Sequence, residues 1–173
     1  TDNSLDLAVD GGGFFQVLLP DGQITYTRNG AFARNNEGTL TTSSGCVVQP
    51  EIVIPAEATK INVSSDGIVS VQIPEQVDAQ EVGQLQLADF QNRTGLQPIG
   101  ENFYIETTAS GPPVLENPFA AGFGKLIQGA LESSNVNVIQ ELVDMIETQR
   151  AYEVNSKAIT SVDEMLRFVS NNL

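Results

Sequence analysis

The chain lacks histidine and tryptophan, and its 173 residues include a single cysteine, Cys46. Histidine is the commonest general base and metal ligand in proteins, so its absence disfavours most acid–base and metal chemistry. One cysteine cannot form an internal disulfide or a thiolate metal site, and the strand-like Gly-Cys-Val-Val context favours a buried, inert thiol. We therefore expect no enzymatic activity, no catalytic residues, no cofactor and no metal ligands.

Basic residues are scarce as well, because 8 Lys and Arg stand against 22 Asp and Glu, giving a formal net charge of −14. Nucleic acids and anionic membrane surfaces are both bound through clustered basic side chains. No apolar run of about 18 residues is present, and the first residues lack the basic and apolar regions of a secretory signal peptide. The composition predicts neither a nucleic-acid partner nor membrane insertion.

Other patterns typical of chemical sites are weak. Gly11, Gly12 and Gly13 precede an apolar strand rather than a helix, which favours a turn or bulge over a phosphate-binding loop. Asp66 and Gly67 form a lone turn signal, not the clustered oxygen ligands of a calcium loop. A carboxylate pair that hydrolyses glycosides stays open as a distant hypothesis, because a sequence cannot place 22 acidic side chains in space.

Short apolar or β-branched runs, separated by glycine-containing turns, fill about the first 110 residues. Pro20, Asp21 and Gly22 lie between two such runs and predict a hairpin. These patterns predict a mainly β fold class, with short antiparallel strands and hairpins in one or two β subdomains. The expected strands are Leu5–Val9, Phe14–Leu19, Ile24–Thr27, Cys46–Val48, Glu51–Ile54, Ile61–Val63, Ile68–Ile73 and Gln84–Leu87.

The pattern changes in the last third of the chain. Residues 109–124 are rich in Gly, Pro and Ala, which indicates an irregular connection, and a short strand at 125–131 is expected to return to the first sheet. From about Val136 to Ser170 no Gly or Pro interrupts the chain, and Asn137 with Gln140 resembles a helix-capping box. One long C-terminal α-helix of roughly 35 residues, about 50 Å long, is therefore expected.

This helix carries apolar residues seven positions apart, which is typical of helices that pack along other helices. They are Val138, Met145, Tyr152, Ile159 and Leu166. Docking of the helix on the β half of the same chain is the alternative, as in many α+β folds. Because no second helix is expected in residues 1–131, we favour a partner outside the chain, either other subunits or an N-terminal helix.

The segment 133–159, SSNVNVIQELVDMIETQRAYEVNSKAI, closely resembles the C-terminal signature of the bacterial flagellar rod and hook proteins. The resemblance covers most of the chain, and its middle stretches are most similar to the distal-rod type. Those stretches are LDLAVDGGGFFQVLLPDG (5–22), YTRNGAF (26–32), VVQPEIVIP (47–55) and GENFYIETTASG (100–111).

The resemblance implies a structural subunit of the flagellar distal rod, which polymerises helically into a hollow drive shaft that transmits motor torque to the hook. The implied partners are further copies of the chain, other rod and hook proteins, the peptidoglycan-layer and outer-membrane ring proteins, and the flagellar export apparatus. The implied location is the basal body, in the rod that spans the periplasm, reached by type III export without a cleavable signal peptide.

A division of the chain follows from the same resemblance. Residues 1–60 and 109–131 are expected to form an inner β-rich connecting domain, residues 61–108 an outer β domain, and residues 132–173 the tube-forming helix. The expected subunit interface consists of Val138, Leu142, Met145, Gln149, Arg150, Tyr152, Asn155, Ile159 and Leu166. The family normally begins with a further helix and linker before the equivalent of Leu5, so the chain is expected to be a fragment.

An extracellular β-domain binding module, such as an adhesin or carbohydrate binder with the helix as a stalk, is the alternative function. It calls for an exposed aromatic cluster. The pairs Phe14-Phe15 and Phe103-Tyr104 are expected to pack inside instead.

Overall fold

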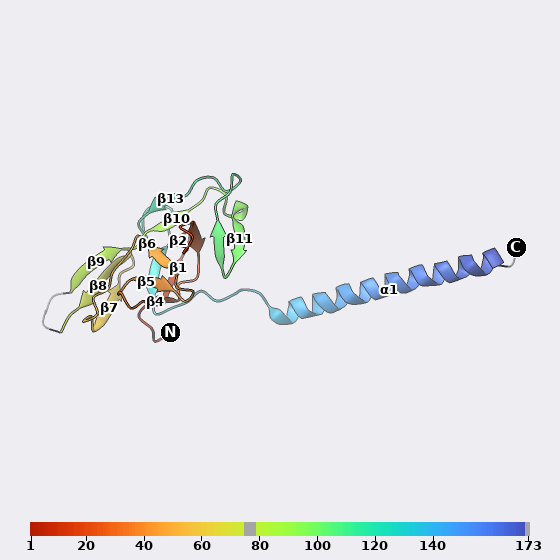
Figure 1. Cartoon of the computed structure of the whole chain (residues 1–173), viewed down its shortest axis with the longest axis horizontal. Coiled ribbons are helices and arrows are strands. Elements are labelled where there is room, and N and C mark those ends of the chain that lie inside the picture. Colours follow the sequence, from red (N-terminus) through yellow and green to blue (C-terminus); the bar gives the residue numbers. More distant parts are fainter. Residues whose placement is uncertain (75–78, 172–173) are drawn as a thin grey trace. The chain divides into compact units, whose positions relative to one another are not determined.

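The computed structural model describes residues 1–74 and 79–171, with side chains up to residue 167. Residues 1–132 form one compact unit, built from strands, and residues 133–173 form a second, which contains the helix α1 (Figure 1). The mainly β fold class with one long C-terminal helix is therefore confirmed. The boundaries of an inner and an outer β domain stay a prediction, and residues 75–78 and 172–173 of the expected segments lie outside the described residues.

The strands of the first unit are short, and a 3-10 turn, η1 at Arg93–Gly95, follows β10. Their bounds are β1 Leu7–Asp10, β2 Phe14–Leu18, β3 Ile24–Thr27, β4 Phe32–Arg34, β5 Leu40–Thr42, β6 Val47–Gln49, β7 Lys60–Val63, β8 Ile68–Gln72, β9 Gln80–Gln84, β10 Leu87–Asp89, β11 Gln97–Gly100, β12 Phe103–Ile105, β13 Val114–Glu116 and β14 Lys125–Gln128.

Strand β2 lies at the centre of a nine-stranded sheet with the order β11-β12-β3-β2-β6-β5-β4. It pairs antiparallel with β3, with Phe15 opposite Thr27, and the expected hairpin is confirmed. Its other edge pairs with β6 and with β10, and β10 pairs in turn with β13. Segments far apart in the sequence are thus hydrogen-bonded to the first hairpin.

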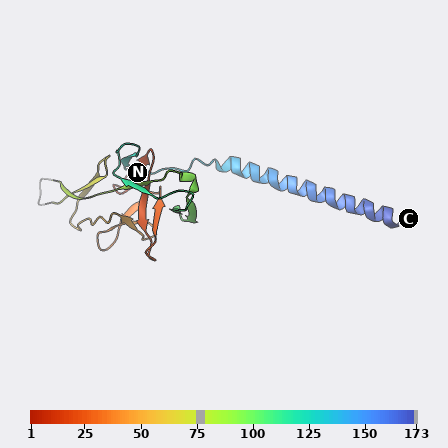
Figure 2. The ribbon, with the colours of Figure 1, turned by 90° about the horizontal axis from the view of Figure 1, so that it is seen from above.

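Two smaller sheets complete the described part of the first unit. Strand β14 returns to pair with β1, as expected for residues 125–131, and β7, β8 and β9 form a three-stranded sheet at the end of the unit away from β11 (Figures 1 and 2). Gln128 of β14 links the two small sheets. Its Nε2 donates to the carbonyl oxygen of Ile61 at 3.0 Å, and its Oε1 accepts from the N–H of Val63 at 3.2 Å.

The core consists of clusters beneath these sheets. Phe15 is fully buried and contacts Phe32 edge to face, with ring centroids 5.0 Å apart. Cys46 is buried beside Val17 and Phe103, which confirms the expected buried thiol. The aromatic pairs that were expected to pack inside do so, because every member is buried or packed against a core cluster.

Tyr26 occupies a second cluster with Phe90, at 4.8 Å between ring centroids. Burial raises the pKa of Tyr26 to about 12, and the negative charge of Glu106 adds to the effect. The phenol therefore stays protonated over the physiological range, and its ionisation at high pH opposes folding.

The structure corrects several expected strands. Residues 51–54 form no strand, and Val53 makes only an isolated bridge with Thr39. The alternating apolar pattern arises because Ile52 and Ile54 are buried in the core, while their backbone bonds are irregular. The expected strand 84–87 falls across the break between β9 and β10, and the 109–124 connection contains β13.

Candidate assembly surface

The helix α1, Val138–Asn171, begins close to the predicted position. The side-chain Oδ1 of Asn137 accepts hydrogen bonds from the backbone N–H groups of Ile139 and Gln140, at 3.1 and 3.4 Å. The first turn of a helix leaves such donors without backbone partners, so Asn137 acts as the N-cap. The position at which the helix begins is therefore set by a local residue, Asn137.

Large apolar side chains are exposed along the whole described length of α1. Each has an exposed fraction between 45% and 75%. They are Val138, Ile139, Leu142, Val143, Met145, Ile146, Tyr152, Val154, Ile159, Val162, Met165 and Leu166. Isolated exposed apolar residues are ordinary, but a continuous set of this size is typical of a surface that binds another protein.

All nine predicted interface residues lie on α1, and all have exposed side chains. Spacings of three and four residues bring Val138, Leu142, Met145 and Gln149 to one side of the helix. The apolar stripe does not stay on that side of the helix at Tyr152, Ile159 and Leu166, which are seven residues apart. A straight helix has slightly more than 3.5 residues per turn, so residues at this spacing drift around it. Their role in an interface stays a prediction.

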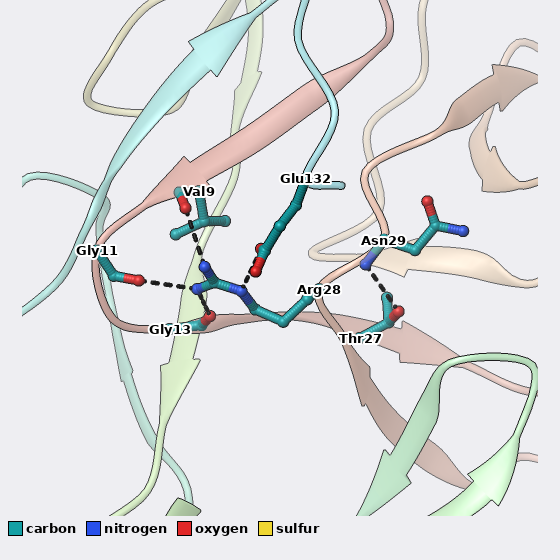
Figure 3. Close-up of polar contacts among 7 residues, drawn as sticks. All are labelled: Val9, Gly11, Gly13, Thr27, Arg28, Asn29 and Glu132. Atoms are coloured by element: carbon teal, nitrogen blue, oxygen red, sulfur yellow. Dashed lines mark hydrogen bonds and ion pairs between the residues drawn. The ribbon is translucent and has the colours of Figure 1, made fainter. Parts of the chain in front are cut away.

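The segment that leads from the first unit toward α1 is held by a cluster around Arg28, just after β3 (Figure 3). The Nε of Arg28 donates to the carboxylate of Glu132 at 2.8 Å. Its Nη1 donates to the carbonyl oxygens of Gly11 and Gly13, at 2.9 and 2.7 Å, and its Nη2 donates to that of Val9 at 3.0 Å. One guanidinium thus joins the β1–β2 turn to the last residue of the first unit.

The environment explains why arginine suits this position. The guanidinium presents a rigid fork of donors that matches several carbonyl groups at once, and it lies 6.0 Å from the ring centre of Phe14. The following turn is fixed locally, since the N–H of Asn29 donates to the Oγ1 of Thr27 at 3.1 Å. Only 27% of the Arg28 side chain is exposed, against 48% of Glu132.

Sequence reasoning did not identify this cluster. Arg28 and Glu132 are 104 positions apart, and no local pattern connects them. The available signal was the rarity of basic residues, which makes each arginine a candidate for a specific contact.

A second exposed apolar surface was also unforeseen. Val114 and Leu115 of β13 and the nearby Phe119 are between 43% and 70% exposed. Beside them lies a hollow of about 430 Å³, whose lining includes Phe90 and Phe123. This region belongs to the connection that was expected to be irregular.

The described part of the chain was also searched for a metal site and for a catalytic pair of carboxylates. Within residues 1–74 and 79–171, no three His, Cys, Asp or Glu residues are grouped closely enough to hold a metal ion. A hollow of about 750 Å³ is lined by Cys46, Phe103 and neighbouring residues, but Glu101 is the one carboxylate in its lining. A carboxylate pair for glycoside hydrolysis is therefore missing from this hollow. No described helix combines the length and apolar character needed to cross a membrane.

Comparisons with known proteins match both ends of the chain. A family model described as "Flagellar hook protein FlgE/F/G D1 domain" matches residues 8–71, and one described as "Flagellar basal body rod FlgEFG protein C-terminal" matches residues 127–173. The second match contains the exposed apolar surface of α1.

Curated relatives extend the match over nearly the whole chain. The "Flagellar basal-body rod protein FlgG" of Buchnera aphidicola subsp. Acyrthosiphon pisum is 52% identical over 170 residues, which are 98% of this chain and 65% of that protein. The FlgG of Bacillus subtilis is 40% identical over 99% of this chain and 66% of its own length. The "Flagellar hook protein FlgE" of Salmonella typhimurium is 38% identical over 68% of this chain and 29% of its own length.

The chain thus spans slightly less than two thirds of the length of the rod relatives that it matches. Identity at these levels over such a share of the chain is well above what a common fold alone produces. With the two family models, it shows that the chain belongs to the family of flagellar basal-body rod and hook proteins.

Proposed function

We propose that the protein is a structural subunit of the bacterial flagellar distal rod, which polymerises helically into a hollow drive shaft that transmits motor torque to the hook. The observation that carries the proposal is the continuous exposed apolar surface of α1 in a member of the rod and hook family. Burying one such side chain stabilises an interface by about 1.5–3 kcal/mol. Because every subunit carries the same helix surface, repetition of this contact from one subunit to the next builds a polymer.

A torque-transmitting shaft needs stiffness rather than reactive groups. Dense packing of helices from neighbouring subunits resists twisting, because close-packed interiors deform little. The short-stranded β unit is tied to the start of the segment that leads to α1 by the contact of Arg28 with Glu132. In the proposed subunit, residues 1–60 and 109–131 form an inner β-rich connecting domain, and residues 61–108 form an outer β domain. We assign no catalytic residue and no cofactor.

The proposed partners follow from this role. Copies of the same chain and other rod and hook proteins contact the ends and sides of the polymer, and the peptidoglycan-layer and outer-membrane ring proteins surround it. The flagellar export apparatus delivers the subunit to the basal body. A net charge of −14 and the scarcity of basic residues fit protein partners better than nucleic acid.

A carbohydrate- or surface-binding module with a helical stalk receives no support. The relatives named above are rod and hook proteins, and the pairs Phe14-Phe15 and Phe103-Tyr104 are buried or packed against core clusters.

The test replaces Leu142, which is 49% exposed, by Glu in the gene that encodes the protein. Ser156→Glu, an equal change at another exposed position of α1, is the matched control. Cells with Leu142→Glu should lose swimming and isolated basal bodies should lack complete rods, whereas Ser156→Glu cells should keep both. Normal rods and swimming with Leu142→Glu would contradict the proposal, provided that circular dichroism shows an unchanged fold.

A further inference from the structure

The sulfur-containing side chains of the chain differ in their access to solvent. Both methionines, Met145 and Met165, lie on α1, and their exposed fractions are 51% and 62%. The single cysteine, Cys46, is buried in the β unit, residues 1–132, with an exposed fraction of 6%. An oxidant in solution therefore reaches the methionine sulfurs of α1 before it reaches the thiol of the β unit.

The two methionines occupy different positions relative to the apolar stripe of α1, whose residues are seven positions apart. Met145 belongs to this stripe, seven residues after Val138, and Leu142 lies beside it one turn earlier. Met165 directly precedes Leu166 of the stripe, so it lies about 100° away around the helix. Of the two methionines, only Met145 belongs to the predicted subunit interface.

Hydrogen peroxide converts the thioether of a methionine into a sulfoxide. A lone pair of the sulfur attacks one peroxide oxygen, the O–O bond breaks, an S–O bond forms and water leaves, so that sulfur is oxidised and peroxide is reduced. A flexible apolar side chain thereby becomes a polar one. Its new oxygen is an acceptor that needs a hydrogen-bond donor when it is buried in an interface.

The surroundings of Met145 on its own helix offer few donors for that oxygen. The nearest side chains on a helix are three and four positions away. Among them the carboxylate of Glu141 only accepts, and the hydroxyl of Thr148 donates to the carbonyl oxygen four residues earlier at 2.8 Å. Among these described neighbours, the amide of Gln149 is the one donor left. Residues 138–149 also contain three acidic residues and no basic one, so this segment holds no positive charge that would attract a sulfoxide oxygen.

We propose that Met145 is an oxidation-sensitive site that controls assembly: hydrogen peroxide converts its side chain into the sulfoxide, and the oxidised subunit no longer joins the rod. This rests on the proposed function and adds a form of regulation to its interface. The change is reversible, because methionine sulfoxide reductases remove the oxygen as water while two thiols become a disulfide. A subunit that is oxidised before assembly is excluded, whereas a subunit already in the polymer buries Met145 and is protected.

The test uses the full protein that the gene encodes and two substitutions that each remove one of these methionines. Met165→Leu keeps the sulfur of Met145, and Met145→Leu keeps that of Met165, so each variant is the matched control of the other. Each free subunit is treated with hydrogen peroxide, catalase removes the oxidant, and peptide mass spectrometry measures the oxygen added to the remaining methionine of α1. Sedimentation over a range of concentrations then measures assembly, relative to the same variant without peroxide.

The two variants should respond differently. Oxidised Met165→Leu should need a concentration at least about tenfold higher than its untreated form to assemble, because each contact between subunits then buries a sulfoxide. Oxidised Met145→Leu should change by less than about twofold. Methionine sulfoxide reductases with a dithiol should restore assembly of oxidised Met165→Leu. Its circular dichroism should not change on oxidation; a loss of helix would mean that the sulfoxide unfolds α1, which overturns a mechanism based on the interface.

The outcomes separate this inference from the proposed function. If the untreated protein forms no polymer under any salt condition, both fail. If it assembles, but oxidised Met165→Leu assembles equally well or oxidised Met145→Leu is inhibited as strongly, the inference falls while the rod function stands. Peroxide added to the finished polymer of the unsubstituted protein gives a check that needs no variant. There Met145 should be oxidised at least about tenfold more slowly than in the free subunit, and an equal rate would show that the polymer leaves it exposed, which overturns the inference.

Discussion

Replacement of Arg28 by Ala should destabilise the β unit more than any other single change to an exposed or half-exposed charge. The substitution removes four hydrogen bonds, three of them to the backbone carbonyl groups of Val9, Gly11 and Gly13. It also removes a cation from the neighbourhood of the Phe14 ring. The carbonyl groups face the place that the guanidinium leaves, so water must enter to satisfy them.

The expected magnitude follows from these contacts. A hydrogen bond to a charged donor contributes about 1.5–3 kcal/mol, but water can replace part of it because 27% of the Arg28 side chain is exposed. The ion pair with Glu132 contributes less than about 1 kcal/mol, since the carboxylate is half exposed. We expect Arg28→Ala to lower the free energy of unfolding by about 2–4 kcal/mol, Arg28→Lys by about half as much, and Glu132→Ala by less than 1 kcal/mol.

Cys46 provides the assay. It is the single thiol of the chain, it is 6% exposed, and it lies in the β unit, so its rate of alkylation in urea reports opening of that unit alone. The order of the three variants is the decisive result. If Glu132→Ala costs as much as Arg28→Ala, the ion pair rather than the carbonyl contacts holds the cluster; a loss below about 0.5 kcal/mol for Arg28→Ala would refute the reasoning altogether.

Other predictions concern the same unit. Burial raises the pKa of Tyr26 from about 10 to about 12, so the protonated phenol contributes fully to the free energy of unfolding below pH 10. As the pH rises toward 12, the free energy of unfolding should fall by about 2–3 kcal/mol, and Tyr26→Phe should remove this fall from urea titrations at alkaline pH. A hydrogen bond from Arg93 lowers the pKa of Asp89, so the ionised Asp89 stabilises the fold above about pH 4, and this stabilisation is lost as the pH falls further. Arg93→Gln should therefore weaken the fall of the free energy of unfolding at acid pH, and an unchanged fall would contradict this. Gly30→Ala would bring a Cβ within 1.7 Å of the carbonyl oxygen of Leu7, so thermal unfolding should show a loss of about 3 kcal/mol or more.

Elements with a local physical cause were predictable from the sequence. The Pro-Asp-Gly turn and the alternating residues beside it define the β2–β3 hairpin, and β3 has the predicted bounds, Ile24–Thr27. Asn137 marks the start of α1 because its side chain bonds to the next turn. Strand β5, Leu40–Thr42, was missed because it is only three residues long and contains a single large apolar residue, and its pairing with β4 and β6 defines it as a strand.

The candidate site likewise has one part that the sequence predicts and one part that it does not. Exposure of the apolar residues of α1 could be expected from the length of the helix and from the strand-like pattern of residues 1–131, both of which the sequence indicates. The Arg28 cluster depends on backbone carbonyl groups that converge only after β1 has paired with β14 and β2 with β3, and carbonyl groups carry no sequence signal. Such contacts are visible only in three dimensions.

The heptad pattern of α1 describes a stripe that turns slowly around the helix. Residues seven positions apart drift by about 20° per heptad around a straight helix, so Val138, Tyr152 and Leu166 do not lie directly above one another. A partner helix can follow such a stripe by supercoiling around α1. Polar replacement of Tyr152, which belongs to the stripe, should therefore weaken assembly of the rod, whereas the same replacement of Gln140, which lies outside the stripe, should not. A rod that tolerates Tyr152→Ser as well as Gln140→Ser would argue against the stripe as an interface.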